Sequence, residues 1–271
     1  MIQSVISVFA ALLWASSVAA MGPWKSGNCH NQTACELGDR SYHVLEPDDW
    51  DGTTPLPVLL HFHGWARQGD LVVRHERIAG ASRLRGVLLV APNGLGKSWN
   101  FWNSDTNDVA FANAVLADVA SRYPIDPSRV FVSGYSYGGA MAWRYVCESG
   151  QHVAALLAIS GTLRQTENCA QAPGEVRHVH GLDDTVMDFP FGPQGDQTFP
   201  VALWRRHYDC GAATRAKTWG VVPFLSLART EWPTCQQGKV TLDTHPGGHF
   251  IPHGWIGWQL DELMGNPPRY P

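Results

Sequence analysis

A serine between glycines is the clearest chemical signal in this sequence. Residues 134–139 read Gly-Tyr-Ser-Tyr-Gly-Gly, so Ser136 occupies the centre of a G-x-S-x-G motif. An apolar, strand-like run at residues 129–132 precedes the motif, and a helix-like run at residues 140–147 follows it. A serine on a sharp strand-to-helix turn is strained and exposed, which suits a nucleophile. We therefore predict a nucleophilic Ser136, with an ordinary glycine-rich turn as the alternative.

A nucleophilic serine needs a base, and the base needs a carboxylate that orients it. Asp183 and Asp184 follow a strand-like run, as an orienting carboxylate requires, with turn and helix-cap aspartates as the alternative. His249 comes after two glycines near the C-terminus, with His245 and His253 close to it in the sequence. The order serine, acid, histidine is that of α/β-hydrolases. We favour His249 as the base because a histidine on a glycine-rich loop can approach a serine.

Acyl transfer also requires hydrogen-bond donors for the oxyanion of the tetrahedral intermediate. The N–H of Tyr137, directly after the serine, is the first expected donor. The second is the N–H of Trp65, in the loop after an early apolar strand. A later loop is rich in aromatic and amide side chains, and Trp99, Asn100 and Trp102 are its candidate substrate-binding residues. Packed loop anchors are the competing interpretation of these three residues.

Apolar strand-like runs alternate with helix-like runs along the chain, which favours a parallel sheet covered on both faces. We expect one α/β domain with a mostly parallel central sheet, and a ligand site at the carboxyl ends of its strands. The expected strands are residues 55–63, 87–90, 129–132, 153–159, 175–180, 225–231 and 239–244, the last two as a hairpin. The expected helices are residues 69–85, 109–123, 140–147, 199–208 and 254–264.

Composition and the N-terminus bound the class of protein. The net charge of −4 provides no basic surface for nucleic acid. Residues 1–20 contain an apolar core and a small-residue cleavage pattern, so they are expected to be a signal peptide, with an uncleaved anchor as the alternative. Residues 21–271 would then form the catalytic domain of a protein secreted to the periplasm or the cell exterior. No other segment predicts a stable membrane insertion.

The six cysteines, an even number, fit that oxidising compartment. Many connectivities are open to six cysteines, and none of the spacings forms a CxxC motif. Asn31 begins a glycosylation triplet, which matters only in a eukaryotic secretory host. Proximity in the sequence favours Cys29–Cys35. The position of Cys210 at the end of an expected helix and of Cys235 between two expected strands favours Cys210–Cys235, which leaves Cys147–Cys169 as the third pair.

Four stretches together resemble the extracellular polyhydroxybutyrate depolymerase and feruloyl esterase-like group of α/β-hydrolases. The most specific one, residues 108–143, places a helix, Ile-Asp-Pro, a strand and the serine turn in fixed order. The others are HFHGW at residues 61–65, HGLDDTV at residues 180–186 and GGHFIP at residues 247–252. The resemblance covers most of the chain after the proposed signal peptide.

This resemblance implies a serine carboxylic-ester hydrolase that acts on polyhydroxybutyrate oligomers, feruloyl esters or related esters. It implies that Asp184 rather than Asp183 is the acid, that His249 is the base, and that a disulfide like Cys210–Cys235 is present. It implies neither cofactor nor metal, and the expected partner is an ester substrate bound by a monomer. Tyr137 departs from the Asn or Ala that the family often has after the serine.

Three other functions compete with this interpretation. Serine followed by Tyr-Gly-Gly also resembles prolyl-oligopeptidase-type serine peptidases, although this chain has no room for their additional propeller domain. The pairs His61/His63 and His178/His180 each lie on one face of an expected strand, a spacing that a zinc-dependent hydrolase could use. A non-catalytic binding protein on the same fold is the third alternative.

Overall fold

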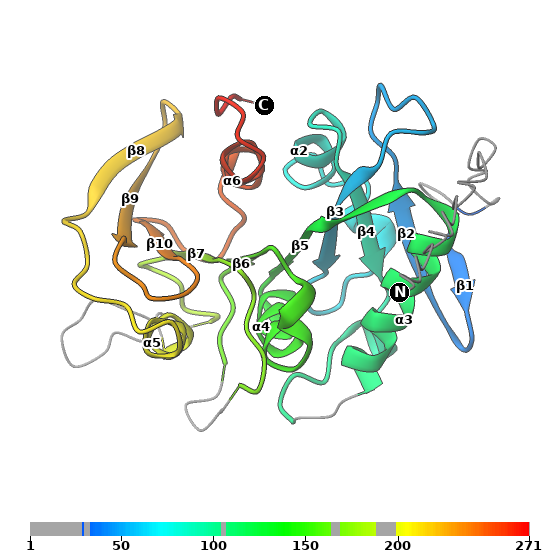
Figure 1. Cartoon of the computed structure of the whole chain (residues 1–271), viewed down its shortest axis with the longest axis horizontal. Helices are drawn as coiled ribbons and strands as arrows, with labels where there is room; N and C mark the ends of the chain where they lie inside the picture. The colour runs from blue at the N-terminus through cyan, green and yellow to red at the C-terminus, as the bar shows by residue number, and fades with distance from the viewer. Residues whose placement is uncertain (1–28, 30–32, 104–106, 164–168, 188–198, 271) are drawn as a thin grey trace, which may run out of the picture.

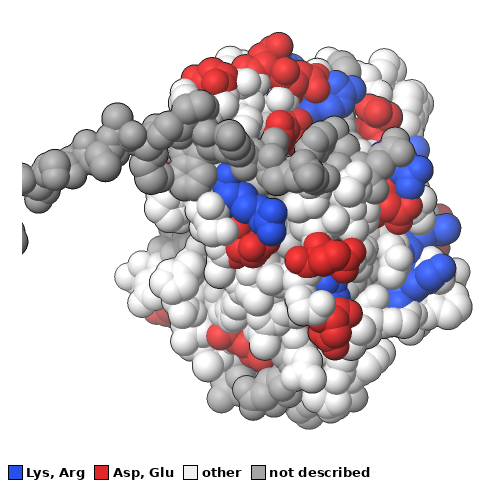
Figure 2. All heavy atoms as spheres, turned by 90° about the vertical axis from the view of Figure 1, so that its right-hand side faces the viewer, with Lys and Arg blue, Asp and Glu red and all other residues white. Residues whose placement is uncertain are grey.

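The computed structural model describes residues 29, 33–103, 107–163, 169–187 and 199–270. The predicted signal peptide at residues 1–20 and the triplet that begins at Asn31 lie outside the described residues. Among the helices of the described part, none is long and apolar enough to cross a membrane. Figure 2 shows Lys and Arg side chains interspersed with Asp and Glu on one face of the molecule.

The described strands form one ten-stranded sheet (Figure 1). In chain order they are β1 (Cys35–Leu37), β2 (Arg40–Leu45), β3 (Leu56–Phe62), β4 (Leu88–Pro92), β5 (Ile125–Tyr135), β6 (Ala155–Ile159), β7 (Val176–Gly181), β8 (Lys217–Val222), β9 (Leu225–Trp232) and β10 (Val240–His245). Their order across the sheet is β1-β2-β4-β3-β5-β6-β7-β10-β9-β8. The neighbouring strands β4, β3, β5, β6, β7 and β10 pair in parallel. At one edge β2 and β1 continue the sheet with antiparallel pairing, and at the other edge β9 and β8 do the same. This arrangement confirms the predicted mostly parallel sheet.

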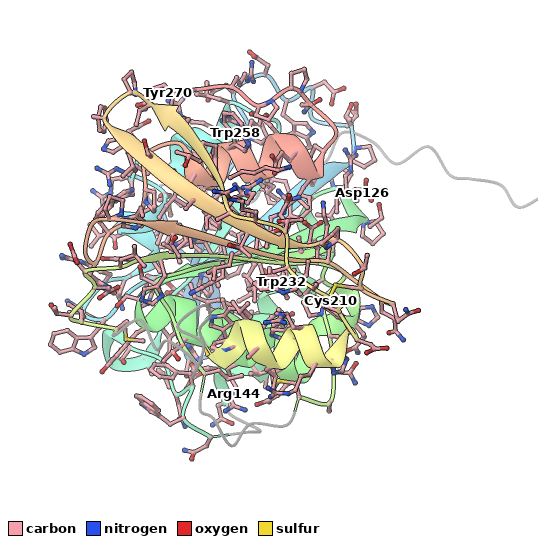
Figure 3. The ribbon with its side chains drawn as sticks, turned by 90° about the vertical axis from the view of Figure 1, so that its left-hand side faces the viewer. Asp126, Arg144, Cys210, Trp232, Trp258 and Tyr270 are labelled. Carbon is pink, nitrogen blue, oxygen red and sulfur yellow. A yellow bond between two sulfur atoms is a disulfide. The ribbon has the colours of Figure 1, made fainter. Side chains whose placement is uncertain are left out.

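Helices cover both faces of the sheet, as predicted. They are α1 (Gly69–Val72), α2 (Ala79–Arg83), α3 (Asn107–Arg122), α4 (Tyr137–Ser149), α5 (Phe199–His207) and α6 (Trp255–Leu263), with short 3₁₀ turns η1 (Leu95–Lys97) and η2 (Gly150–His152). Figure 1 places α2 and α6 on one face and α3, α4 and α5 on the other. In Figure 3, Trp258 of α6 and Arg144 of α4 accordingly lie on opposite sides of the sheet.

The central strands are buried on both faces because each face supports its own hydrophobic core. Every residue of β3 is buried. Val58, Leu60 and Phe62 contribute to the core under α3, α4 and α5, whereas Leu59 contributes to the core under α2 and α6. The continuous apolar sequence of β3, rather than an alternating pattern, follows from this double burial.

Two parts of the fold differ from the sequence expectations. The helix predicted over residues 69–85 is broken into α1 and α2, since the adjacent β-branched Val72 and Val73 favour helix weakly and α1 ends there. The edge strands β1, β2 and β8 were not predicted. β8 is mostly exposed, so it has no long apolar run that would mark it as a strand. The predicted pairing of the two late strands is confirmed as the antiparallel pair β9–β10.

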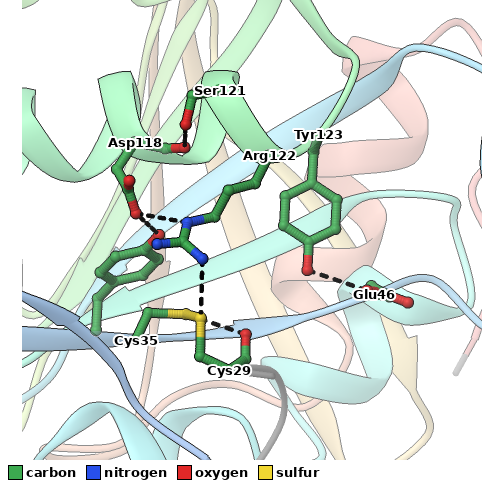
Figure 4. Close-up of a disulfide and its surroundings, with 8 residues drawn as sticks. Cys29, Cys35, Glu46, Asp118, Ser121, Arg122 and Tyr123 are labelled. Atoms are coloured by element: carbon green, nitrogen blue, oxygen red, sulfur yellow. Dashed lines mark hydrogen bonds and ion pairs between the residues drawn. A yellow bond between two sulfur atoms is a disulfide. The ribbon is translucent and has the colours of Figure 1, made fainter. Parts of the chain in front are cut away.

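The structure contains the three favoured disulfides, Cys29–Cys35, Cys147–Cys169 and Cys210–Cys235. Figure 4 shows the first of them beside α3, where Arg122 Nη1 lies 3.4 Å from Cys29 Sγ. The same guanidinium donates through Nε to Asp118 at 2.8 Å. The sequence separations are 6, 22 and 25 residues, and in the chain-entropy account closure of such loops stabilises the fold by about 2 to 4 kcal/mol each.

Candidate active site

Ser136 lies on the sharp turn between β5 and α4. Its backbone angles, φ 60° and ψ −123°, are strained for a residue with a side chain. The two glycines of the motif make this turn possible. A Cβ atom on Gly134 would lie 2.0 Å from the Gly138 carbonyl oxygen, and one on Gly138 would lie 1.9 Å from the Phe62 carbonyl oxygen. The spacing of G-x-S-x-G is therefore explained by backbone segments that touch at both glycines.

The backbone of Ser136 is held from both sides. Its N–H donates to Ile159 at 3.0 Å, and its carbonyl accepts the Ala140 N–H at 2.9 Å. The hydroxyl has no hydrogen-bond partner among the described residues. Because Ser136 precedes the first turn of α4, its side chain stands at the positive end of that helix. A strained serine with an unengaged hydroxyl at this position is suited to nucleophilic attack.

Asp184 is bound to the ring of His249. Its Oδ2 lies 2.7 Å from His249 Nδ1, while its Oδ1 accepts the N–H groups of Val186 and Met187 at 2.9 Å each. Burial acts to raise the pKa of Asp184, but the His249 hydrogen bond and the two backbone donors outweigh it, so the pKa is lowered. Asp183 is exposed instead. Of the two aspartates, Asp184 alone is placed to orient this histidine within the described site.

His249 is fixed next to the serine turn through Tyr135. The Tyr135 hydroxyl donates to the His249 carbonyl at 2.9 Å, and the two rings lie 4.9 Å apart between centroids. No hydrogen bond joins Ser136 to His249 in the described residues, and such catalytic bonds are often long in the absence of substrate. The interaction of Tyr135 was not predicted, although its position directly before the serine is a usable signal.

The two other histidines of this region are engaged elsewhere. His245 is buried, and its Nδ1 accepts the Gly247 N–H at 3.2 Å. His253 Nε2 lies 2.5 Å from Arg77 Nη2. Neither of them contacts Asp184 by a hydrogen bond in the described residues, so the geometry separates His249 from both alternatives.

The predicted oxyanion donors stand on the two segments that meet at the serine. Gly64 lies against the turn, since a Cβ atom there would be 3.4 Å from the Tyr135 carbonyl oxygen and 3.7 Å from Ser136 Cβ. Trp65 follows directly, with its side chain 67% exposed. Tyr137 is the first residue of α4, where an N–H has no acceptor inside the helix. Both N–H groups therefore come from segments that adjoin Ser136.

The aromatic loop after β4 is placed beside this site, but its residues are not equivalent. Trp99 is 4% exposed, and its Nε1 donates to the His63 carbonyl at 2.8 Å, so it supports the Trp65 loop from within. Trp102 is 44% exposed and lies 4.4 Å from Phe101 between ring centroids. Phe101 is also 5.1 Å from Tyr137, which makes these three rings a continuous aromatic flank of the site.

The remaining predicted residue of that loop, Asn100, is exposed. Its backbone N–H donates to Asp108 Oδ2 at 2.7 Å, which ties the loop to the start of α3. Its side-chain Oδ1 lies 3.4 Å from Asn103 Nδ2. Asn100 is therefore held mainly by its backbone, and its amide stays at the surface of the loop.

Comparisons with known proteins find esterases. The family described as Phospholipase/Carboxylesterase matches residues 103–208. Probable feruloyl esterase C of Aspergillus niger is 29% identical over 169 residues, which cover 60% of this chain and 62% of that protein. Feruloyl esterase C of Emericella nidulans is 27% identical over 221 residues, or 79% of this chain and 77% of that protein. Over these parts of its length the chain is similar to the Phospholipase/Carboxylesterase family and to feruloyl esterases.

The solved structures support the same fold for this chain. An acetyl xylan esterase from Aspergillus awamori superposes with a TM-score of 0.62 at 17% identity, over 84% of this chain and 94% of the other. An identity this low shows the common fold alone. The esterase relatives described above are what support a carboxylic-ester hydrolase.

The two His-x-His pairs have hydrogen-bond partners within the protein. His178 Nδ1 lies 3.1 Å from the Ala158 carbonyl, and its Nε2 lies 3.1 Å from His180 Nδ1. His180 Nε2 lies 2.6 Å from the Met187 carbonyl and 3.3 Å from Asp184 Oδ2. Burial lowers the pKa of both rings. Sequence reasoning missed this contact of His180 with the acid, although the two residues are four apart.

The earlier pair is likewise engaged. His63 Nδ1 lies 2.8 Å from the Gly64 carbonyl, and its Nε2 accepts the Gly94 N–H at 3.0 Å. His61 Nδ1 lies 3.1 Å from Ser133 Oγ. In the part of the chain that the structure describes, no group of three or more His, Cys, Asp or Glu side chains could hold a metal ion. These histidines form the polar floor of the site.

Proposed function

We propose that Ser136, His249 and Asp184 form the catalytic triad of a serine esterase. The observation that carries this proposal is the 2.7 Å contact between Asp184 Oδ2 and His249 Nδ1, on a loop that Tyr135 holds beside the serine turn. A carboxylate on Nδ1 fixes the imidazole tautomer, so that Nε2 is left to accept the serine proton.

The proposed reaction is acyl transfer in two halves. His249 accepts the hydroxyl proton of Ser136 as the oxygen attacks the ester carbonyl, and Asp184 stabilises the imidazolium that forms. The N–H groups of Trp65 and Tyr137 bind the oxyanion. His249 then protonates the leaving alcohol, and water repeats the sequence on the acyl-enzyme to release the acid. Each half balances its protons through His249 and needs no cofactor.

Feruloyl-type esters are the substrate class that we propose. The aromatic flank of Phe101, Trp102 and Tyr137 supports this choice, since an aromatic acyl group can stack on exposed ring surface beside the serine. The names of the Aspergillus and Emericella relatives point in the same direction. Polyhydroxybutyrate oligomers, the other substrate of the resembling group, stay a prediction without support from these relatives.

A substrate panel tests the proposed class. Purified protein would be assayed with methyl ferulate, acetylated xylan, hydroxybutyrate oligomers and nitrophenyl esters of increasing chain length. We expect the highest kcat/KM among natural esters for methyl ferulate. A clear preference for acetylated xylan or for hydroxybutyrate oligomers would overturn the feruloyl assignment while leaving the serine chemistry intact.

We also infer that the protein works in an oxidising compartment. Three disulfides in a chain of this size are typical of exported proteins. One disulfide ends in β1 and a second in α4, and the third links two residues that also form an isolated β-bridge, so reduction should loosen these segments. Unfolding with and without a reductant would measure that contribution.

A further inference from the structure

A cavity of about 570 Å³ adjoins the serine turn on the side of α1 and α2. Gly64 and Tyr135 line it where it meets the turn, and Phe250 and Ile251 line it in the loop directly after His249. The cavity is therefore lined by the sequence neighbours of Ser136 and His249, and none of the residues of the aromatic flank lines it. Neither the triad proposal nor the feruloyl assignment gives it a role.

Three arginines line this cavity, which we call the cationic cavity: Arg67, Arg74 and Arg77. No Asp or Glu is among its lining residues in the described structure. Such a concentration of guanidinium groups is unusual here, because the whole chain carries a net charge of −4. A low-dielectric cleft lined by one sign of charge attracts ligands of the other sign.

The three guanidinium groups are not equally available. Arg74 is paired with Asp70. Arg77 donates to the Ile251 carbonyl at 2.5 Å and contacts His253, so it braces the loop after His249. Arg67 is exposed and has no ion pair or side-chain hydrogen bond among the described residues. One guanidinium without a partner matches a singly charged anion.

The floor of the cavity adds polarity without adding charge. Burial lowers the pKa of His61 to about 3 and that of His63 to about 4, so both rings are neutral at pH 7. His61 is also engaged with Ser133, and His63 with Gly64 and Gly94. The positive potential of the cavity thus comes from its arginines.

The position of the cavity indicates which part of an ester it would contact. In the proposed reaction His249 protonates the leaving alcohol, so the alcohol lies on the side of His249. The cavity shares Phe250 and Ile251 with the loop that carries this histidine. The aromatic flank lies on Tyr137 and on the loop after β4 instead. The cavity therefore faces the alcohol portion of the substrate.

We propose that the cationic cavity binds a carboxylate carried by the alcohol portion of the ester, with Arg67 as its main partner. A planar guanidinium binds a carboxylate through two parallel N–H donors. The preferred substrates are then esters of hydroxy acids or of acidic sugars rather than of neutral alcohols. This inference rests on the proposed function, because it takes the side of the leaving group from the role of His249.

A matched pair of esters tests the proposal. Chlorogenate, a hydroxycinnamoyl ester of a hydroxy acid, and its methyl ester differ only in whether the carboxylate is free. We expect Arg67→Gln to lower the ratio of kcat/KM for chlorogenate to kcat/KM for the methyl ester by about three- to tenfold, between an exposed ion pair and a charged hydrogen bond. Added salt should lower the same ratio in the wild type.

Two further variants separate charge from position. Arg67→Lys keeps the charge and should retain part of the ratio. Arg206→Gln removes an exposed charge from α5, on the opposite face of the sheet, and should leave the ratio unchanged. An unchanged ratio in Arg67→Gln, or an equal loss in Arg206→Gln, would overturn the assignment.

Binding to a Ser136→Ala variant distinguishes failure of this proposal from failure of the proposed function. Calorimetry would compare the dissociation constants of chlorogenate and its methyl ester without turnover. Tighter binding of chlorogenate that is lost with Arg67→Gln supports the cavity even if neither ester is hydrolysed by the wild type. Equal dissociation constants for both esters would refute the carboxylate site even if both are hydrolysed.

Discussion

The two sides of Ser136 differ in chemistry although they share one edge of one sheet. The aromatic flank of Phe101, Trp102 and Tyr137 offers rings packed 4.4 and 5.1 Å apart. The cationic cavity offers arginines over a floor of neutral histidines. One side suits an aromatic acid, and the other suits an anionic alcohol. The serine thus lies between two surfaces that select different parts of an ester.

The aromatic flank and the cationic cavity differ because they are built from segments that follow different strands. The aromatic flank belongs to the loop after β4 and to the start of α4, where Trp99 and Asn100 anchor the loop to β3 and α3. The cationic cavity belongs to the segment after β3, where the predicted helix is broken between α1 and α2. Arg77 lies in this break and donates to the Ile251 carbonyl, so the irregular segment also supports the loop of His249.

The largest effect is expected from removal of the Ser136 hydroxyl, which lies between the two surfaces. Ser136→Ala should lower kcat/KM for a nitrophenyl ester by at least about 10⁴-fold, because the nucleophile is lost. Ser121→Ala, at an exposed position of α3, is the matched control and should keep full activity. Retained activity in Ser136→Ala, with an unchanged unfolding curve, would show that Ser136 is not the nucleophile. The two surfaces would then not flank a catalytic serine.

The next effect distinguishes the two neighbouring aspartates. Asp184→Asn should cost about 10³- to 10⁴-fold in kcat, because an amide at this position favours the wrong imidazole tautomer of His249. Asp183→Asn should cost less than about twofold, since Asp183 is exposed and does not contact the ring. The reverse ranking would transfer the acid to Asp183.

A third effect concerns the neutral floor beneath the cationic cavity. His61 and His63 line the cavity and have folded-state pKa values lowered by burial to about 3 and 4. His245 packs against Phe250 next to the cavity, and burial lowers its pKa to about 4. Below pH 6.5 the unfolded chain binds protons that the folded chain does not, so stability is full above that pH and falls as the pH falls. Each such histidine costs about 2 kcal/mol between pH 6.5 and pH 5.

Urea unfolding at pH 7 and pH 5 measures this loss. Four carboxylates have lowered pKa values, so they lose their contribution mostly below pH 5 and do not dominate this window: Asp51, Asp126, Asp184 and Glu262. His61→Gln should make the decrease smaller than in the wild type. Equal stability at both pH values would mean that the floor carries charge, and the contrast between the two sides would weaken.

The smallest effect examines the aromatic side alone. Trp102→Ala should lower kcat/KM for methyl ferulate about two- to tenfold relative to nitrophenyl acetate, because a stacking surface is lost. Phe224→Ala removes an exposed ring between β8 and β9 and serves as the control. If both esters respond equally to Trp102→Ala, the flank does not select the acyl group.

Residues whose role depends on local sequence could be predicted, and those whose role depends on tertiary contacts could not. Ser136 and its glycines follow from the backbone contacts that the motif requires. The placements of His180 beside Asp184 and of Tyr135 beside His249 depend on the register of β7 and on the path of the last loop. Edge strands such as β8 escaped prediction because exposure leaves them without an apolar pattern.

Covalent labelling tests directly whether Ser136 is the nucleophile. An organophosphonate would be incubated with the wild type and with Ser136→Ala, and the adduct located by peptide mass spectrometry. We expect one adduct in the wild type, on the peptide that contains Ser136, with loss of activity in proportion to labelling. We expect no adduct in Ser136→Ala. An adduct on another residue, or full esterase activity after complete labelling of Ser136, would contradict it.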